Sequence, residues 1–206
     1  MVSRERLIVT GLTLVCACGV ARAAATEFDF KDPKKVNTIS IFLDSKLEPI
    51  VGLASGISGL VTFDPAKPEA LTGKIVVESK SIEFANNGLE EALHGPDWLD
   101  SKKNPEVSFS VKKVEDVKKE GNKTRMMVTG DFLCKGITRE IKVPVEATVV
   151  PDGAAQRSRN GKGDLLVLRS NFVVKRSDFK LKDDMGPDLV ADDMELRVAI
   201  VGHPKK

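Results

Sequence analysis

The chain has few of the residues that build catalytic or metal centres. Its 206 residues include only two histidines, His94 and His203, and three cysteines. These residues share no ligand spacing, and neither a C-x-x-C nor an H-x-x-x-H motif is present. A catalytic triad would need one histidine beside a nucleophile and a carboxylate, and no other motif in the sequence supports that arrangement. The sequence therefore predicts a protein that is not an enzyme and binds no metal.

Long apolar runs are missing from the chain except at its start. Arg4 and Arg6 precede an apolar run over residues 7–20, which is too short for a typical membrane span. Small residues follow, and cleavage after Ala23 or Ala25 fits them. This order of features predicts a secretory signal peptide over residues 1–23.

Cysteine is nearly absent from the remaining chain. Cys134 is the only cysteine after the predicted leader, so no intramolecular disulfide can form, while a disulfide to a second copy would allow a homodimer. Cys18 lies in Val-Cys-Ala-Cys, a loose match to a bacterial lipobox. Lipid anchoring through Cys18 is therefore the alternative to a cleaved leader and a free periplasmic or secreted domain over residues 24–206.

An excess of basic charge is also missing. The predicted leader holds three arginines and one glutamate, which leaves 29 basic and 29 acidic side chains in residues 24–206. The formal charge of that part is zero. No basic face for nucleic acid is implied.

The clearest pattern in the chain is strict alternation of apolar and polar residues. Apolar residues recur at every second position from Ile141 to Val149, and a less regular strand covers 123–134. Lys135-Gly136 separates the two and predicts a tight turn. The stretch 123–150 is therefore expected to form a long antiparallel hairpin.

Other segments supply further strands. Similar patterns cover 36–44, 51–63, 73–82, 107–114, 164–176 and 194–201. Glycines within 51–63 are typical of a bend in a strand rather than of a phosphate loop. Residues 86–94 change to helical spacing and predict a short helix, whereas 151–163 are expected to form a polar loop.

Eight antiparallel strands and one short helix predict an all-β protein. A closed, lipocalin-like eight-stranded β-barrel with a helical insertion would hide both sheet edges. A β-sandwich is the competing architecture, but it gives no reason for the helical insertion. A barrel of eight strands is either filled by side chains or holds one small ligand.

Three segments carry a resemblance to a known family. They are Leu93–Asp100 with Asn104–Ser110, the turn segment Gly130–Arg139, and Arg176-Ser177-Asp178-Phe179. In this order they resemble the conserved segments of the YceI family. Phe28 stands where the family usually has tryptophan, and Lys180 where it has glycine.

The resemblance implies a lipocalin-like barrel exported to the bacterial periplasm, with a long apolar pore that binds a polyisoprenoid or another long-chain lipid. Transient membrane contact would accompany such a role. A bound polyisoprenoid is the one non-protein group expected. The candidate lipid-binding residues are Ile41, Leu43, Ile75, Val77, Leu89, Leu93, Trp98, Phe109, Phe132, Ile141, Val143, Val145 and Phe172.

Two alternatives stay open at this point. A barrel filled by side chains would act through the loops at 152–163 and 183–188, as a non-catalytic protein associated with envelope stress. An enzyme would need polar groups converging inside the barrel, and the best candidates are Arg169, Asn171, Arg176 and Asp178. Trp98 either plugs one mouth of the barrel or simply packs the helix against it.

Overall fold

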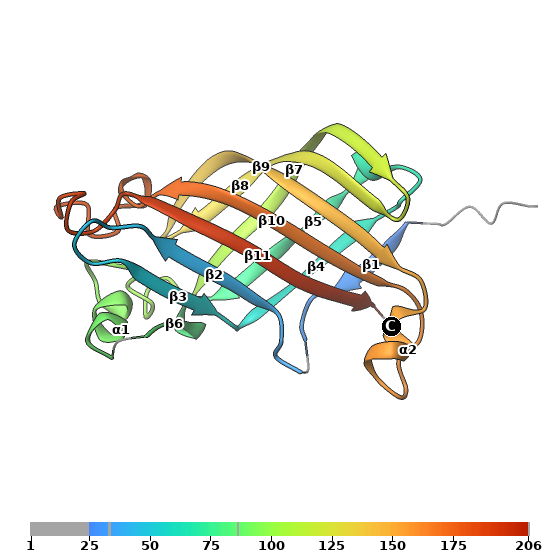
Figure 1. Ribbon diagram of the computed structural model, residues 1–206, viewed down its shortest axis with the longest axis horizontal. Coiled ribbons are helices and arrows are strands. Elements are labelled where there is room, and N and C mark those ends of the chain that lie inside the picture. The colour runs from blue at the N-terminus through green and yellow to red at the C-terminus, as the bar shows by residue number, and fades with distance from the viewer. Residues whose placement is uncertain (1–24, 33, 86, 206) are drawn as a thin grey trace, which may run out of the picture.

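Alternating sequence patterns produce eleven strand segments in the computed structural model, which describes residues 25–205 except 33 and 86 (Figure 1). The predicted signal peptide and Cys18 lie outside the described residues. The strands are β1 (Thr26–Asp29), β2 (Thr38–Leu43), β3 (Ile50–Ala54), β4 (Ile57–Phe63), β5 (Thr72–Glu78), β6 (Ile82–Phe84), β7 (Glu106–Glu120), β8 (Lys123–Cys134), β9 (Ile137–Val150), β10 (Leu165–Lys175) and β11 (Asp193–Pro204).

The strands close into a ring in which every neighbour is antiparallel. The order is β1-β4-β5-β7-β8-β9-β10-β11, and β1 returns to pair with β11. Three further segments extend the walls, because β2 pairs with β11, β3 with β2, and β6 with β3. The pairs β1–β2, β3–β4 and β5–β6 are thus single strands with an interruption. The eleven segments make a closed eight-stranded barrel, which confirms the predicted fold and excludes the sandwich.

One interruption is a glycine bend of the predicted kind. β3 ends at Ala54 and β4 begins at Ile57, so Gly56 lies in the break. A Cβ atom on Gly56 would lie 2.7 Å from the Cβ of Ser81, so this close approach of two segments requires glycine. The strand predicted over 73–82 is also broken, because the 3₁₀ helix η2 (Ser79–Ser81) separates β5 from β6.

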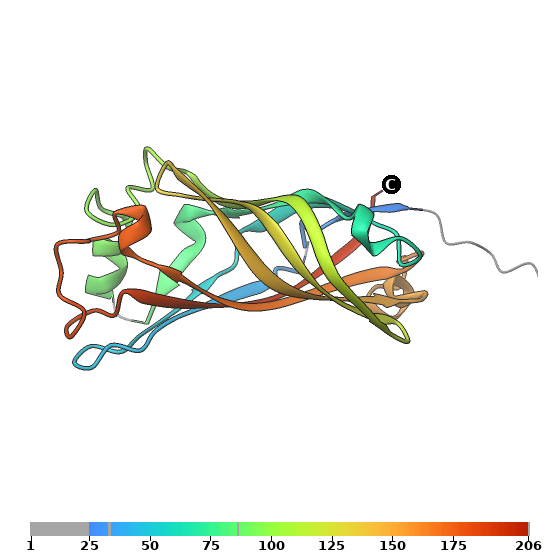
Figure 2. The ribbon, with the colours of Figure 1, turned by 90° about the horizontal axis from the view of Figure 1, so that it is seen from above.

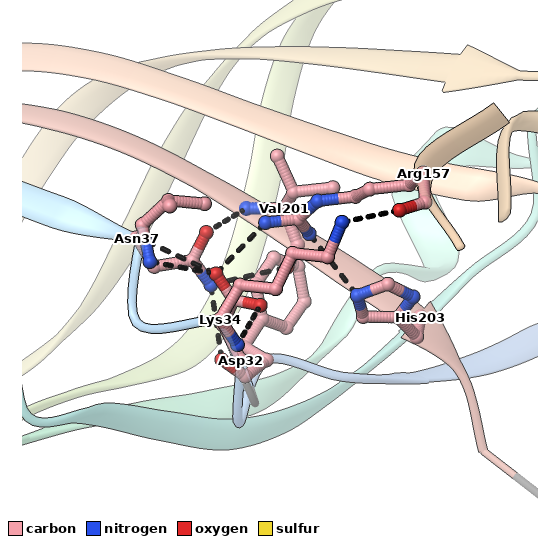
Figure 3. A network of polar contacts seen from close by, with 8 residues as sticks. Asp32, Lys34, Asn37, Arg157, Val201 and His203 are labelled. Carbon is pink, nitrogen blue, oxygen red and sulfur yellow. Dashed lines mark hydrogen bonds and ion pairs between the residues drawn. The ribbon is translucent and has the colours of Figure 1, made fainter.

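A buried side chain closes the gap between β1 and β2 (Figure 3). Asn37 Nδ2 donates to the carbonyls of Phe30 and Val201 at 3.0 and 3.1 Å, and its Oδ1 accepts from the Val201 N–H at 2.9 Å. Val201 lies in β11 between the residues that pair with β1 and those that pair with β2. The Asn37 amide therefore takes the place of a strand backbone and keeps both polar groups of Val201 satisfied.

The β8–β9 hairpin forms as predicted. Its register is continuous from Lys123↔Thr148 to Cys134↔Ile137. The two loop residues, Lys135 and Gly136, have φ angles of 48° and 72°. Two positive φ angles define a type I′ turn, whose twist matches that of the flanking strands.

Helices lie at opposite ends of the barrel (Figures 1 and 2). The predicted helix is present as α1 (Asn87–His94). The expected loop at 151–163 instead contains α2 (Gly153–Arg157), whose Gly153 and Ala154 are buried. Two 3₁₀ helices, η1 (Pro68–Ala70) and η3 (Ser177–Phe179), complete the connections. No helix in the described part of the chain has the length and apolar character to span a membrane.

The barrel interior is filled at the α2 end. Phe63, Met126, Ala147 and Leu166 lie toward that end of their strands, Phe30 follows β1, and all five are at most 3% exposed. Phe30 packs over Gly202, where an added Cβ atom would lie 2.7 Å from its ring. These five residues form what we call the floor of the barrel. Burial of such side chains stabilises the fold by about 1.5–3 kcal/mol each.

Candidate ligand cavity

A cavity of about 180 Å³ lies between the floor and the α1 end. Along β8 the lining begins at Val128 and ends at Cys134, and along β11 it runs from Met194 to Ile200. Floor residues such as Met126 and Leu166 do not line it. The barrel is therefore filled in one part and hollow in the other, which neither open alternative for its interior foresaw.

Most candidate residues from the sequence meet at this cavity. Eleven of the thirteen line it: Ile41, Leu43, Ile75, Val77, Leu93, Trp98, Phe109, Phe132, Val143, Val145 and Phe172. They come from six strands, α1 and the segment after α1. The alternation rule succeeded here because each strand has one face turned toward the barrel axis.

The other two candidates do not line the cavity. Ile141 belongs to the inward face of β9 and Leu89 to α1, and both pack half-buried against the core. Ile141 lies opposite Gly130, close to the β8–β9 turn. The β8 residues on either side of Gly130, Val128 and Phe132, do line the cavity, so alternation predicted the face that Ile141 occupies but not which inward side chains reach the cavity.

Several lining residues were missed by the sequence analysis. Met194, Leu196, Val198 and Ile200 alternate along β11, so the same rule would have found them. Leu181 also lines the cavity, but it lies in an irregular segment. No periodicity marks a residue of that kind.

Arg176 holds the loop over residues 181–191, which we call the lid, at the α1 end of the barrel. Its guanidinium is 2% exposed and donates to five backbone carbonyls, those of Leu181, Lys182, Met185, Val190 and Ala191. It also lies 5.8 Å from the centre of the Trp98 ring, within cation–π range. A buried cation held by many carbonyls fixes the loop over residues 181–191 against the barrel.

Trp98 lies between the cavity and Arg176. Its side chain is 9% exposed, lines the cavity and contacts Arg176. The aromatic rings of Phe132 and Phe179 meet edge to face at 5.3 Å beneath the same lid. Trp98 thus packs the segment after α1 against the barrel and lines the cavity at this end.

The one thiol in the cavity lining also behaves as an apolar group. The thiol of Cys134 lines it and is 4% exposed, and burial raises its pKa to about 12. The thiol therefore stays neutral and behaves as a small apolar group. Its burial also argues against the disulfide-linked homodimer, because a partner thiol could not reach it in this fold.

The polar groups proposed for an enzyme do not converge in the barrel. Arg169, Asn171 and Asp178 are exposed, and Arg176 is committed to the lid carbonyls. Within the described part of the chain, no three His, Cys, Asp or Glu side chains come together as metal ligands would.

A second polar cluster anchors α2 at the opposite end of the barrel (Figure 3). Arg157 Nη2 donates to Asp32 Oδ2 at 2.8 Å, and Arg157 Nη1 donates to His203 Nε2 at 3.0 Å. Lys34 Nζ donates to the carbonyl of Arg157. The cluster holds a carboxylate and an imidazole but no nucleophile, so it works as an anchor for α2.

Two pKa values in this anchor depart from their ordinary range. Burial raises the pKa of Asp32, but hydrogen bonds from the Val36 and Lys34 N–H groups, together with Arg157, outweigh burial and lower it overall. Burial and the charge of Arg157 lower the pKa of His203. A guanidinium only donates, so Nε2 of His203 must be unprotonated to accept its hydrogen bond.

The fold and cavity define a class of protein, namely a lipocalin-like barrel that encloses an apolar pocket. The sequence profile described as the YceI-like domain matches residues 24–202. The chain therefore belongs to the YceI-like family.

Individual relatives agree with this assignment. A UPF0312 protein of Shewanella oneidensis is 26% identical over 156 residues, 76% of this chain and 75% of the relative. The crystal structure of Burkholderia cenocepacia BcnA matches with a TM-score of 0.64 and 24% identity, over 80% of this chain and 95% of that one. A polyisoprenoid binding domain from Saccharophagus degradans, implicated in plant cell wall breakdown, matches with a TM-score of 0.62 and 8% identity, over 88% and 100% of the two chains.

Proposed function

We propose that this protein is a non-catalytic periplasmic carrier that holds the chain of an isoprenoid-type lipid in its barrel cavity. The observation that carries the proposal is a cavity inside the barrel lined almost wholly by aliphatic and aromatic side chains. The leader pattern at residues 1–23 supports export. A carrier of this kind would meet a membrane transiently to collect and deliver its lipid.

Simple energetics support the choice of ligand. Burying one methylene group contributes about 0.8 kcal/mol, so a five-carbon isoprene unit contributes roughly 3–4 kcal/mol before the costs of association. Micromolar binding requires about 8 kcal/mol net. A few isoprene units bound by apolar contact are sufficient. The head group then needs no dedicated polar site, in keeping with the lack of converging charges in the described barrel interior.

The cavity volume bears on the alternative function. A filled barrel acting through the loops at 152–163 and 183–188 predicts no continuous cavity, and a space of about 180 Å³ counts against it. That space is nevertheless smaller than the roughly 300–1,000 Å³ of typical small-molecule sites. A long chain therefore places only part of its length between the floor and the lid.

Native mass spectrometry tests the proposal directly. Protein purified from its own periplasm is expected to carry a lipid adduct that organic solvent removes. Adding the C20 prenol geranylgeraniol to the stripped protein should change the fluorescence of Trp98, the only tryptophan in the chain. A ligand-free mass together with an unchanged Trp98 signal would overturn the carrier function.

A further inference from the structure

Two neighbouring strands of the barrel wall separate halfway along their length. β9 and β10 pair from Leu165↔Val150 to Arg169↔Glu146 and no further. Beyond that point β9 stays paired with β8 down to Ile137, and β10 stays paired with β11 up to Lys175. We call the unpaired stretch, residues 140–145 of β9 and 170–175 of β10, the β9–β10 seam.

A proline explains why the pairing stops. Continuing the register would place Pro144 opposite Asn171. Even-numbered residues of β9 direct their backbone polar groups toward β10, since the odd-numbered Val149 donates its N–H toward Asn122 on the β8 side. Pro144 therefore lacks the amide hydrogen on the side that faces β10.

One side-chain contact bridges the start of the seam. Ser170 Oγ donates to the carbonyl of Pro144 at 2.5 Å, in place of a ladder hydrogen bond. At the far end, η3 closes the seam, because Arg139 Nε donates to the carbonyl of Asp178 at 3.3 Å. Separating the strands between these two points would break few hydrogen bonds.

The seam borders the cavity. Val143 and Val145 line the cavity from β9, and Ser170 and Phe172 line it from β10. Arg169, which points outward by alternation, also lines the cavity at the last paired position.

Other parts of the wall are paired or covered, and β6, which pairs only with β3, has α1 packed beside it. Lys74 and Ser108 also line the cavity, but they lie where β5 and β7 pair without interruption. The β5–β7 ladder ends at Lys74↔Ser110, and there Leu71, 6% exposed, and η1 cover the wall. The floor fills one end of the barrel, and the buried side chains of Trp98 and Leu99 line the cavity at the other.

From this arrangement we infer that the lipid chain enters and leaves the cavity sideways, through the β9–β10 seam, and that a chain too long for the cavity extends out through it. The inference rests on the proposed carrier function. It also gives Pro144 a role, because this residue weakens one side of a wall that backbone hydrogen bonds hold along most of its length. Ser170 acts as the latch of the seam.

A covalent lock tests the inference. Lys142→Cys and Val173→Cys lie opposite each other across the seam and are exposed in the wild type. A bismaleimide cross-link between them would hold the strands together. The control joins Val173→Cys to Glu195→Cys, a pair within the continuous β10–β11 ladder. The native Cys134 is buried and its pKa is raised, so it does not compete for the reagent.

Stopped-flow Trp98 fluorescence with geranylgeraniol measures loading and release. The seam lock is expected to slow both rates by about tenfold or more while leaving Kd nearly unchanged, and the control lock should change neither. Unchanged rates in the seam-locked protein overturn sideways access alone. Failure of the uncross-linked protein to bind the prenol overturns the carrier function and this inference together.

Two single substitutions test the same inference without cross-linking. Pro144→Val restores an N–H for the ladder and is expected to slow exchange by about threefold to tenfold, the factor expected for one hydrogen bond. Ser170→Ala removes the latch and should accelerate exchange by a similar factor. Equal rates in the wild type and both variants would contradict the seam as the path, provided circular dichroism shows that each variant is folded.

Discussion

At the scale of single residues, the two most buried charged groups act on opposite ends of the barrel. Arg176 fixes the lid through backbone carbonyls, and Asp32 fixes α2 through Arg157. Both ions are buried, so each would be costly without its partners. Their role in the structure is to hold irregular segments, which lack the regular hydrogen bonds of a sheet.

Arg176→Lys should destabilise the protein by about 2–3 kcal/mol, because an ammonium group cannot reach carbonyls spread over the planar fork of a guanidinium. Urea denaturation measures the loss. Arg197→Lys is the matched control, since Arg197 is 64% exposed and pairs only with surface groups in the described structure. Its effect should stay within about 0.5 kcal/mol. Equal losses in the two variants would show that the contacts of Arg176 with buried carbonyls add nothing to the free energy of unfolding.

The α2 anchor should make the protein sensitive to acid. The pKa of His203 is lower in the folded state than its ordinary value of 6.5, so unfolding favours the protonated imidazole. The contribution of His203 to stability is therefore complete above 6.5 and is lost as pH falls through the folded-state pKa. Asp29 and Asp32 oppose the lowering of this pKa, while Arg157 and Lys34 favour it. Asp32, whose pKa is also lowered, adds a further loss in more acidic solution.

His203→Gln keeps an acceptor for Arg157 but does not titrate. We expect the variant to lose less stability than the wild type between about pH 7.5 and about pH 5.5, two values that bracket the ordinary histidine pKa of about 6.5. Urea denaturation at each pH measures the loss. Asp32→Asn serves as the comparison, because it should change the profile mainly at lower pH. Parallel profiles for wild type and His203→Gln would exclude His203 as the titrating group.

At the scale of elements, the β8–β9 hairpin depends on its turn. Gly136 has a φ angle of 72°, and a Cβ atom there would lie 3.0 Å from Asn104 Oδ1. Lys135 accepts a positive φ next to it and donates through Nζ to the carbonyls of Asp97 and Lys180. The turn that the family signature marks therefore joins the hairpin to the residues just before Trp98 and Leu181, as well as reversing the chain.

Gly136→Ala is expected to destabilise the protein by about 1–2 kcal/mol, the cost of holding an L-residue in the left-handed region. Thermal unfolding followed by circular dichroism gives the comparison. Gly186→Ala is the control, because a Cβ atom at Gly186 would meet nothing within 4 Å. It should be neutral or slightly stabilising. A neutral Gly136→Ala would indicate that the turn relaxes to another type.

At the scale of the whole molecule, the barrel divides its interior between stability and binding. The floor supplies a packed core, and the cavity lies between it and the α1 end. Val198 lines that space from β11 at a half-buried position. Enlarging such a residue fills the cavity at little cost to the folded state, because the cavity provides the volume.

Val198→Phe should weaken geranylgeraniol binding by about tenfold or more while leaving the melting temperature within a few degrees of the wild type. Trp98 fluorescence titration and thermal unfolding measure the two quantities. Val51→Phe is the control, since Val51 is 54% exposed and does not line the cavity. Equal binding by wild type and Val198→Phe would place the ligand outside the cavity.

The sequence by itself determined the barrel, the β8–β9 hairpin and most of the cavity wall. Those features follow from local physics, because alternation decides which face of a strand is buried and Lys135-Gly136 decides where the chain reverses. Candidates such as Phe132 and Val143 were therefore found without the fold.

Only the tertiary structure decided where the interior is hollow. Met126 and Val128 occupy equivalent positions in the alternating pattern of β8, yet Met126 belongs to the floor and Val128 lines the cavity. The partners of Arg176 and of Asn37 also required the fold, since irregular segments carry no period that predicts their contacts. Pro144 shows the division most clearly. Its missing amide hydrogen is evident in the sequence, but which neighbouring strand loses a hydrogen bond depends on the pairing of β9 with β10.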